Sequence, residues 1–294
     1  MASPIKVLVL ADLHIGSEFA LWPLDFKLPG GGTYIPSEPQ QWLHENVWQN
    51  IVNATPKTLD AIIYNGDLID GGNSKDPGEE RILTNTSFQR RAFRELFSPL
   101  LERTPPDDKG YKQIYVTQGT RYHETVSDME TLAESIKACP KFDKDGKPIR
   151  FCHPYCAVEF DGVWIEARHK ISGAWIYFLS SLEREHNLER LASGEKGYVA
   201  DVSLGSHRHK YKYGGGWDSY GHWEAISTPA IELLTDWAKR TNLNAWWPDL
   251  GAIMLYIYPQ YKKMGRRAVF HEAIRVPHPP PQEVFRWTAN LKER

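Results

Sequence analysis

The stretch IKVLVLADLHIG at residues 5–16 decides the fold of this chain. Residues 5–11 form an apolar run typical of a strand that is buried on both faces, and such strands occur mostly in parallel sheets. The run breaks directly into Asp12 and His14, a carboxylate and an imidazole two residues apart. If the strand ends at this point, both side chains can converge on one metal ion.

The stretch AIIYNGDLIDGG at residues 61–72 repeats this design. Gly66 allows a tight turn after the second strand. Asp67 then stands where a carboxylate can bridge two cations, which in dinuclear sites lie about 3.5–4 Å apart. This stretch therefore predicts that a second strand end meets the first.

Two later strands end in histidine. GVWIEARH at residues 162–169 ends in His169, and VADVSLGSHRH at residues 199–209 ends in a pair whose members can point to different ions, His207 and His209. A single Asp or His at a strand end is more often a turn former than a ligand. The shared order, spacing and placement of the set instead indicate a two-metal hydrolase with ligands for manganese, iron, zinc or similar cations.

With these motifs the chain resembles the calcineurin-like metallophosphoesterase superfamily, whose ordered signature is Asp-x-His, Gly-Asp, Gly-Asn-His-Asp/Glu, a lone His, and Gly-His-x-His. The resemblance spans residues 5 to 212. It implies two divalent metal ions, with manganese expected and zinc, iron, nickel or magnesium as alternatives, and a metal-bridging hydroxide as nucleophile. It implies one metal held by Asp12, His14, Asp67 and His209, and the other held by Asp67, His169 and His207.

The third motif, VTQGTRYHE at residues 116–124, carries two extra residues and lacks the Asn ligand of the family. Alignment on the glycine places Thr120 at the Asn position, and alignment on His-Glu places Tyr122 there. The resemblance gives His123 the role of a general acid or phosphate-orienting imidazole, with ligation of the second metal as the alternative. Arg121 has a guanidinium that matches a phosphate oxygen pair, or it only shapes the longer loop.

Strands and helices alternate through the first 204 residues, which predicts sheets covered by helices. We expect the two-sheet α/β sandwich of the resembled family, as one metallophosphoesterase domain over residues 1–276 and a C-terminal tail over 277–294. Residues 251–258 and 268–276 are expected to form an antiparallel pair that closes the second sheet. We expect four helices. The first begins after Ser37, the second covers 85–102, and the third covers 128–138 with Ser127 as its cap. The fourth covers 173–193, with Leu188 facing inward and the charged residues of 183–190 facing outward.

The composition predicts a soluble, cytoplasmic protein without a membrane partner. With 294 residues, 41% of them apolar, the chain can bury a large core. No apolar run approaches the roughly 20 residues that span a bilayer, and the N-terminus leaves no room for a signal peptide. Three cysteines without zinc-ribbon spacing favour a reducing compartment. A net charge of −2 gives no global case for a polyanionic partner.

Substrate selection is expected from loops. The candidate loops are the 18–37, 73–84 and 211–223 segments. The first and the last carry aromatic residues suited to stacking on bases, namely Trp22, Phe26, Tyr34, Tyr211, Tyr213, Trp217, Tyr220 and Trp223. A basic rim on the ligand-bearing face is the accompanying hypothesis, made of Lys210, Lys212, Lys262, Lys263, Arg266 and Arg267.

The leading interpretation is a metal-dependent phosphodiesterase that acts on nucleic acid, such as DNA, or on nucleotides. The first two motifs are also similar to the DNA-end nuclease branch of the superfamily, and the third is similar to that of bacteriophage phosphoesterases. A small-molecule phosphomonoesterase is the alternative, and a catalytically weak binding module with one metal or none is the third. The sequence leaves the oligomeric state open.

Overall fold

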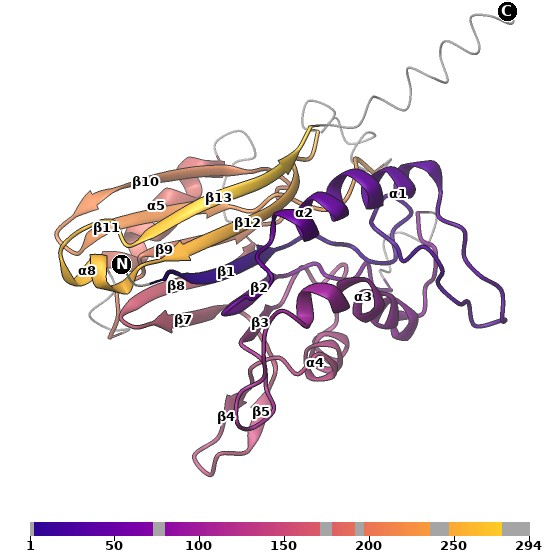
Figure 1. The fold of residues 1–294 in the computed structure, drawn as a ribbon, viewed down its shortest axis with the longest axis horizontal. Helices are drawn as coiled ribbons and strands as arrows, with labels where there is room; N and C mark the ends of the chain where they lie inside the picture. The colour runs from indigo at the N-terminus through magenta and orange to yellow at the C-terminus, as the bar shows by residue number, and fades with distance from the viewer. Residues whose placement is uncertain (1–2, 73–79, 171–177, 192–196, 236–246, 278–294) are drawn as a thin grey trace, which may run out of the picture.

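Two β-sheets packed face to face, with helices on their outer faces, form the body of the molecule in the computed structural model (Figure 1). The structure describes residues 3–72, 80–170, 178–191, 197–235 and 247–277. This architecture confirms the expected two-sheet α/β sandwich. The 277–294 tail falls almost wholly outside the described residues, so the division into one domain and a tail stays a prediction.

The larger sheet has six strands in the order β13-β12-β1-β2-β3-β6. Four of them run parallel to one another: β1 (Ile5–Leu10), β2 (Ala61–Asn65), β3 (Ile114–Thr117) and β6 (Cys152–His153). β12 (Leu250–Ile257) pairs antiparallel with β1, and β13 (Val269–Val276) pairs antiparallel with β12 at the edge of the sheet. The C-terminal pair was expected in the second sheet. It instead extends the sheet of β1, because Ile5 to Val9 offer a free strand edge that β12 takes up.

The smaller sheet has five strands in the order β10-β11-β9-β8-β7. Its members are β7 (Cys156–Phe160), β8 (Val163–Lys170), β9 (Val202–Ser206), β10 (Lys212–Asp218) and β11 (Gly221–Ser227). β7 and β8 form a hairpin, whose turn residues Asp161 and Gly162 both have positive φ, as a type I′ turn requires. A separate two-stranded ribbon, β4 (Lys141–Phe142) and β5 (Pro148–Arg150), projects away from the body (Figure 1).

The helices of the first half cover the outer face of the larger sheet. The helix after Ser37 is a continuous run of α1 (Glu38–Trp42), the π-helical η1 (Leu43–Trp48) and α2 (Gln49–Ala54). α3 (Thr86–Leu101) matches its prediction. α4 (Val126–Ser135) begins earlier than predicted, because Thr125 rather than Ser127 caps it by accepting the Asp128 backbone N–H.

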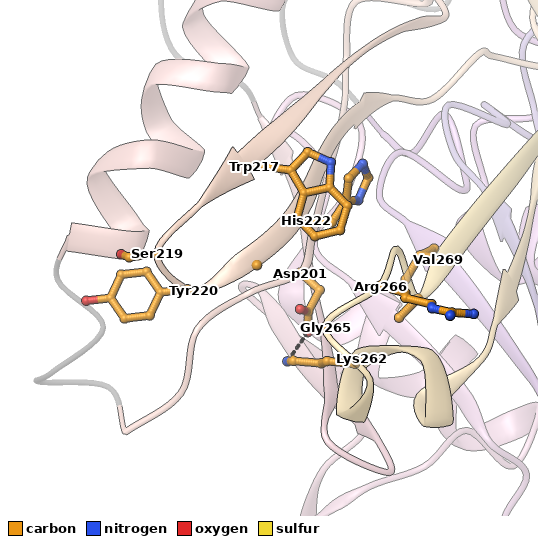
Figure 2. Close-up of a pocket in the computed structure, with 11 residues that line it drawn as sticks. Asp201, Trp217, Ser219, Tyr220, His222, Lys262, Gly265, Arg266 and Val269 are labelled. Carbon is orange, nitrogen blue, oxygen red and sulfur yellow. Dashed lines mark hydrogen bonds and ion pairs between the residues drawn. The ribbon is translucent and has the colours of Figure 1, made fainter.

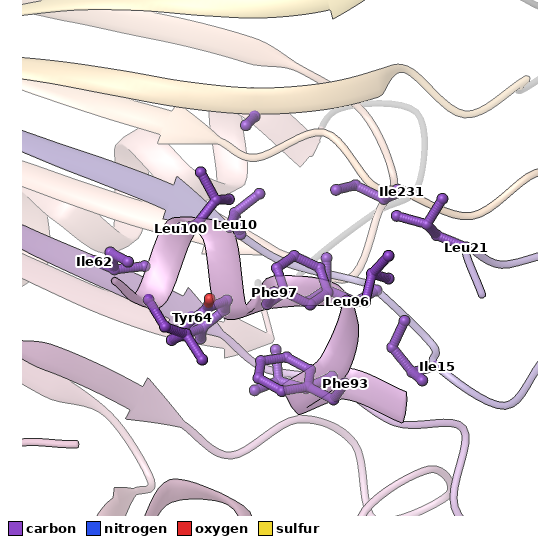
Figure 3. Packing of buried hydrophobic residues seen from close by; sticks show 14 of the residues in the cluster. Leu10, Ile15, Leu21, Ile62, Tyr64, Phe93, Leu96, Phe97, Leu100 and Ile231 are labelled. Carbon is purple, nitrogen blue, oxygen red and sulfur yellow. The ribbon is translucent and has the colours of Figure 1, made fainter. Parts of the chain in front are cut away.

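Alternation along the central strands divides the apolar residues between two cores. Val7 and Val9 of β1 face the smaller sheet, whereas Leu8 and Leu10 face the helices. On the helix side, Phe93 and Phe97 of α3 pack on each other and on Tyr64 of β2, with ring centroids 4.7–5.9 Å apart (Figure 3). Each central strand is therefore buried on both faces, which explains the uninterrupted apolar run.

α5 (Phe178–Leu191) packs on the outer face of the smaller sheet, and its orientation corrects the sequence prediction. Leu188, expected inward, is 57% exposed. Arg190, expected outward, is 2% exposed and is paired with Asp218 of β10 through two contacts of 2.6 and 2.7 Å. The sheet face under α5 offers polar partners, so a paired arginine is buried there in place of leucine. The predicted helical start at 173–177 lies outside the described residues.

α8 (Pro259–Lys263) joins β12 to β13. Within the part of the chain that the structure describes, no helix is long and apolar enough to cross a membrane. The three cysteines are free thiols.

Candidate metal centre

The carboxyl ends of the parallel strands in both sheets meet at one end of the sandwich. Asp12 and Asp67 follow β1 and β2, His169 lies at the end of β8, and His207 follows β9. The Asp67, His169 and His207 ligand atoms lie within 4.8 Å of one another, and so do those of Asp12, His14 and His209. All six ligands expected from the sequence therefore gather at one place.

Asp67 belongs to more than one of these groups. Its Oδ2 lies 2.8 Å from His169 Nε2 and 4.0 Å from His207 Nδ1. The Asp67 carboxylate also forms a third group of close ligand atoms with His14 and His123. A carboxylate that faces nitrogen ligands on two sides has the geometry of a bridging ligand.

Asp12 holds a second central position. Its Oδ1 lies 3.4 Å from His209 Nε2 and 3.8 Å from His169 Nε2. Asp12 and Asp67 are 0% and 1% exposed, so two carboxylates are buried side by side among imidazoles. Such a concentration of buried charge is costly unless cations or charged partners offset it.

Backbone strain is concentrated in the candidate ligands. Of the described non-glycine residues only seven have positive φ, and five of these are ligands: Asp12, His14, Asp67, His207 and His209. Left-handed backbone is uncommon for residues with a Cβ and persists only where surrounding contacts enforce it. The turn that each strand makes at its carboxyl end is therefore held in a conformation that aims the side chain inward.

Two glycines make room for the shared carboxylate. A Cβ on Gly66 would lie 2.6 Å from His169, and a Cβ on Gly119 would lie 2.1 Å from Asp67 Oδ1 and 2.2 Å from the Asp67 backbone nitrogen. Gly66 also has φ of +78°. Both positions accept only glycine without displacing a ligand.

The surroundings of His169 set its orientation. The register between β8 and β9 shifts between Ala167 and Lys170, a bulge that re-aims His169 toward the larger sheet. His169 Nδ1 lies 2.8 Å from the Asn65 carbonyl oxygen and donates to it, which leaves Nε2 directed at the carboxylates. A second hydrogen bond of this kind commonly fixes the tautomer of a metal-binding histidine.

Several buried polar atoms at this site lack hydrogen-bond partners among the described residues, and they provide a test of whether a metal fits. Asp12 Oδ1 and both ring nitrogens of His14 are buried without such a partner. The nearest carboxylate oxygens to the His14 nitrogens are 3.9 Å and 3.6 Å away. Buried polar groups are rarely left unsatisfied, so Asp12 Oδ1 and one of the His14 nitrogens, each able to offer a lone pair, fit a bound cation.

Electrostatics keep both carboxylates ionised. Burial raises the pKa of Asp12 and of Asp67, but the facing imidazoles outweigh burial and leave both pKa values lowered, that of Asp67 strongly so. For His169, burial lowers the pKa, yet Asp67 and Asp12 raise it to about 9. For His207, burial and the charge of His169 lower the pKa to about 4. For His14, burial lowers the pKa, yet Glu232 and the neighbouring aspartates raise it well above its usual value. Without cations, therefore, His14 and His169 carry protons that offset the charge of the carboxylates.

Two buried acids at this site were not anticipated from the sequence. Glu232 is 4% exposed, and its Oε2 lies 3.6 Å from His14 Nε2 and 3.8 Å from His209 Nδ1. Asp70 accepts the Arg81 Nε–H at 2.7 Å and lies 3.0 Å from His123 Nδ1. Asp70 stands in the second motif, three residues after Asp67, and that spacing was a usable signal. Glu232 follows no motif.

The lengthened third motif approaches Asp67 through two residues. The Thr120 backbone N–H donates to Asp67 Oδ1 at 2.6 Å, and the Thr120 hydroxyl lies 3.1 and 3.2 Å from the two carboxylate oxygens. His123 lies within 4.8 Å of both Asp67 and His14. Of the three candidates for the missing Asn, Thr120 and His123 thus contact this group, whereas Tyr122 is 51% exposed. Arg121 is exposed beside His123.

Glu124 ties the third motif to the second. It is 7% exposed and accepts hydrogen bonds from the backbone N–H groups of Leu68 and Gly119. Burial and the nearby charge of Asp67 raise the pKa of Glu124 to about 7. This side chain therefore holds the two loops together beside Asp67.

The structure corrects the predicted recognition loops. Trp22 and Phe26 are 0% exposed and belong to the helix-side core, so they cannot stack on a substrate. The 211–223 segment is the β10–β11 hairpin rather than a loop. Most of the 73–84 segment lies outside the described residues.

The predicted basic rim is also divided. Lys210 and Lys212 follow His209 at the metal end. The other four, Lys262, Lys263, Arg266 and Arg267, lie in or beside α8, which follows the Ile257 end of β12. Ile257 pairs with Ile5 at the start of β1, so these four residues are at the opposite end from Asp12.

Comparison with solved structures finds similar chains of low sequence identity. A phosphatase from Mycoplasma pneumoniae is 12% identical and has a TM-score of 0.45, over 97% of this chain and 98% of that one. A predicted phosphoesterase from Streptococcus pneumoniae is 10% identical, with a TM-score of 0.34 over 93% and 99%. Vps29 from Entamoeba histolytica, crystallised with zinc, is 8% identical, with a TM-score of 0.39 over 92% and 98%.

The neighbours are members of the calcineurin-like metallophosphoesterase superfamily. That is the family which the sequence motifs resemble. No family model matches the chain, and no curated protein matches it. Because the identities are low and the TM-scores lie below 0.5, we base the functional conclusion on the geometry of the site itself.

Proposed function

We propose that the protein is a dinuclear metal-dependent phosphoester hydrolase that acts on phosphodiesters of nucleic acid or nucleotides. The observation that supports this most directly is the position of Asp67 between two groups of nitrogen ligands, His169 with His207 and His14 with His123. One buried carboxylate with ligands on both sides suits a pair of cations better than a single one.

The residues divide into two ligand sets that share Asp67. Asp12, His14 and His209 would complete the first set, and His169 and His207 the second, with Thr120 beside Asp67 where the family has Asn; His123 groups with His14 and Asp67 instead. When bound, two divalent cations ionise a shared water near neutral pH and neutralise charge on the attacked phosphorus. The mixed oxygen and nitrogen donors suit manganese, zinc or iron.

His123 is placed to move a proton at the leaving group. Its side chain is 28% exposed, whereas those of His169 and Asp67 are 1% exposed, so it stands at the mouth of the site. Asp70 accepts a hydrogen bond from His123 Nδ1 at 3.0 Å, and Arg81 in turn holds Asp70. This series of hydrogen bonds orients the His123 ring and directs its Nε2 away from Asp70, so that Nε2 can donate a proton to a departing oxygen. Arg121 is exposed next to His123 and can take a phosphate oxygen.

Two features of the site favour a diester over a small monoester. The side chains of His123, His207 and His209 are each 25–29% exposed, which fits a site open on one side rather than a closed pocket. Lys210 and Lys212 follow His209 and offer positive charge to phosphates that flank the cleaved one.

Manganese-supplemented hydrolysis of bis-p-nitrophenyl phosphate beside p-nitrophenyl phosphate tests the proposal. We expect faster turnover of the diester, abolished by Asp67→Asn and strongly reduced by His123→Ala. Asp60→Asn is the matched control, because Asp60 precedes β2 at the end opposite to Asp67 and is exposed. Monoester preference would contradict the substrate class. Absence of turnover with any divalent metal would contradict the enzyme and favour a binding module.

A further inference from the structure

A second cavity with chemically active side chains lies at the end of the smaller sheet remote from the metal centre (Figure 2). Asp201 lines it and directly precedes β9, whereas His207 directly follows β9. Five residues of strand separate these ends by about 17 Å. The cavity of about 240 Å³ is therefore distinct from the metal site.

An exposed aromatic ring forms one side of this cavity. Trp217 is 60% exposed, although it is large enough to gain from burial. The Tyr220 ring, 51% exposed, points away from Trp217 (Figure 2). The imidazole of His222 lies 5.1 Å from the Trp217 ring in an edge-on arrangement and supports it from the neighbouring strand. An indole face held in this way beside a cavity is suited to stacking on a planar ring.

The aromatic wall is pre-organised. Arg190 of α5 binds the Asp218 carboxylate with two hydrogen bonds, of 2.6 and 2.7 Å, and its guanidinium lies 5.5 Å from the Tyr220 ring centroid. Asp218 also accepts the Tyr220 backbone N–H at 2.8 Å. The turn between β10 and β11 is therefore held in place by a buried arginine, which reduces the entropy lost when a ligand binds.

The polar groups on the opposite side offer one acceptor and one cation. Asp201 Oδ2 accepts the Trp164 backbone N–H at 2.8 Å and the Lys262 ammonium at 2.6 Å, so both of these hydrogen bonds use one oxygen. Oδ1 remains as an acceptor for a ligand N–H. Arg266 lines the cavity, is exposed, and has no ion pair among the described residues. It can bind a phosphate with a guanidinium fork.

We propose that this cavity binds a mononucleotide whose base carries an exocyclic amino group. The base stacks on Trp217, the amino group donates to Asp201, and the phosphate pairs with Arg266. Carboxylates recognise the amino edges of bases in this way. The volume lies below the roughly 300–1,000 Å³ typical of drug-sized ligands, so the cavity holds the base, with the ribose and phosphate at its rim.

Calorimetric titration of the full-length chain with AMP, with and without EDTA, tests this proposal. We expect saturable binding of one AMP per chain that survives EDTA. Adenosine, which lacks the phosphate, ribose 5-phosphate, which lacks the base, and IMP, which lacks the amino group, should each bind at least tenfold more weakly. Loss of AMP binding on adding EDTA would assign the nucleotide to the metal centre and overturn the proposal, whether or not the chain is a phosphoesterase.

Two pairs of variants localise the binding. Trp217→Ala should weaken AMP binding about 5- to 150-fold, the range expected for one stacked base. Tyr213→Ala is its matched control, since Tyr213 is 57% exposed on the same strand but outside the cavity. Arg266→Gln should weaken AMP but not adenosine, and Lys263→Gln should change neither. Equal effects in a variant and its control, with unchanged thermal unfolding, would overturn the assignment.

Discussion

Gly119→Ala should disable the metal centre without touching a ligand. The added methyl group would lie 2.1 Å from Asp67 Oδ1 and 2.2 Å from the Asp67 backbone nitrogen, whereas ordinary contact begins at 3.4 Å. The carboxylate and residue 119 must therefore separate by more than 1 Å. This movement breaks the 2.6 Å hydrogen bond from the Thr120 N–H to Asp67, a charge-assisted bond worth about 1.5–3 kcal/mol.

A displacement of this size at a reacting centre costs about 100-fold in rate. We expect Gly119→Ala to lower diester turnover by at least that factor and to weaken manganese binding in a calorimetric titration. Gly72→Ala is the control, because a Cβ at Gly72 meets nothing within 4 Å. Circular dichroism and thermal unfolding report whether the variant is folded. A folded Gly119→Ala protein with wild-type turnover and metal affinity would refute the reasoning that places Asp67 at the centre.

Three further outcomes are expected. The pKa of His169 is raised to about 9 in the metal-free protein, so manganese must displace a proton from this residue below that pH. Apparent manganese affinity should therefore rise about tenfold per pH unit and per displaced proton between pH 6.5 and 9, and calorimetry in buffers of different ionisation enthalpy measures the proton release. An affinity independent of pH would contradict His169 ligation. The raised pKa of His169 also stabilises the metal-free fold. This stabilisation is full below about pH 6.5, the pKa of histidine in the unfolded chain, and is lost as pH rises through 9. The unfolding temperature of the protein in chelator should therefore fall over that range, and a flat profile would contradict the raised pKa. Glu232→Leu should weaken metal binding about 10–100-fold, while Glu232→Gln, which keeps an oxygen facing His209 Nδ1 at 3.8 Å, should keep most of it. Equal losses would show that Glu232 acts through its charge instead.

The sequence by itself determined the central strands and the ligands that follow them. Apolar runs at residues 5–11 and 61–65 predict strands buried on both faces, and the structure places both at the centre of the larger sheet. Parallel strands bring their carboxyl ends to one edge, so residues that follow these strands can be predicted to meet. For this reason six ligand positions could be inferred although they span almost 200 residues.

Only the tertiary structure decided which other groups reach that edge. Glu232 has no motif around it, and it faces His14 and His209 because the chain near residue 231 hydrogen-bonds to the Asp12 carbonyl oxygen. Arg190 is buried and Leu188 exposed because the sheet under α5 supplies Asp218 as a partner. Helical spacing predicts which side chains share a face, but the chemistry of the packed surface decides which face turns inward.

The placement of the basic residues has the same origin. Lys210 and Arg266 both lie in the last third of the chain, yet β12 runs antiparallel to β1 and carries α8 to the opposite end of the sandwich. The direction of strand pairing depends on contacts between segments about 250 residues apart, which local sequence patterns do not encode. The sequence therefore determined the residue types of the candidate metal centre, and strand pairing decided that the aromatic residues at the β10–β11 turn and the basic residues beside α8 would meet far from it.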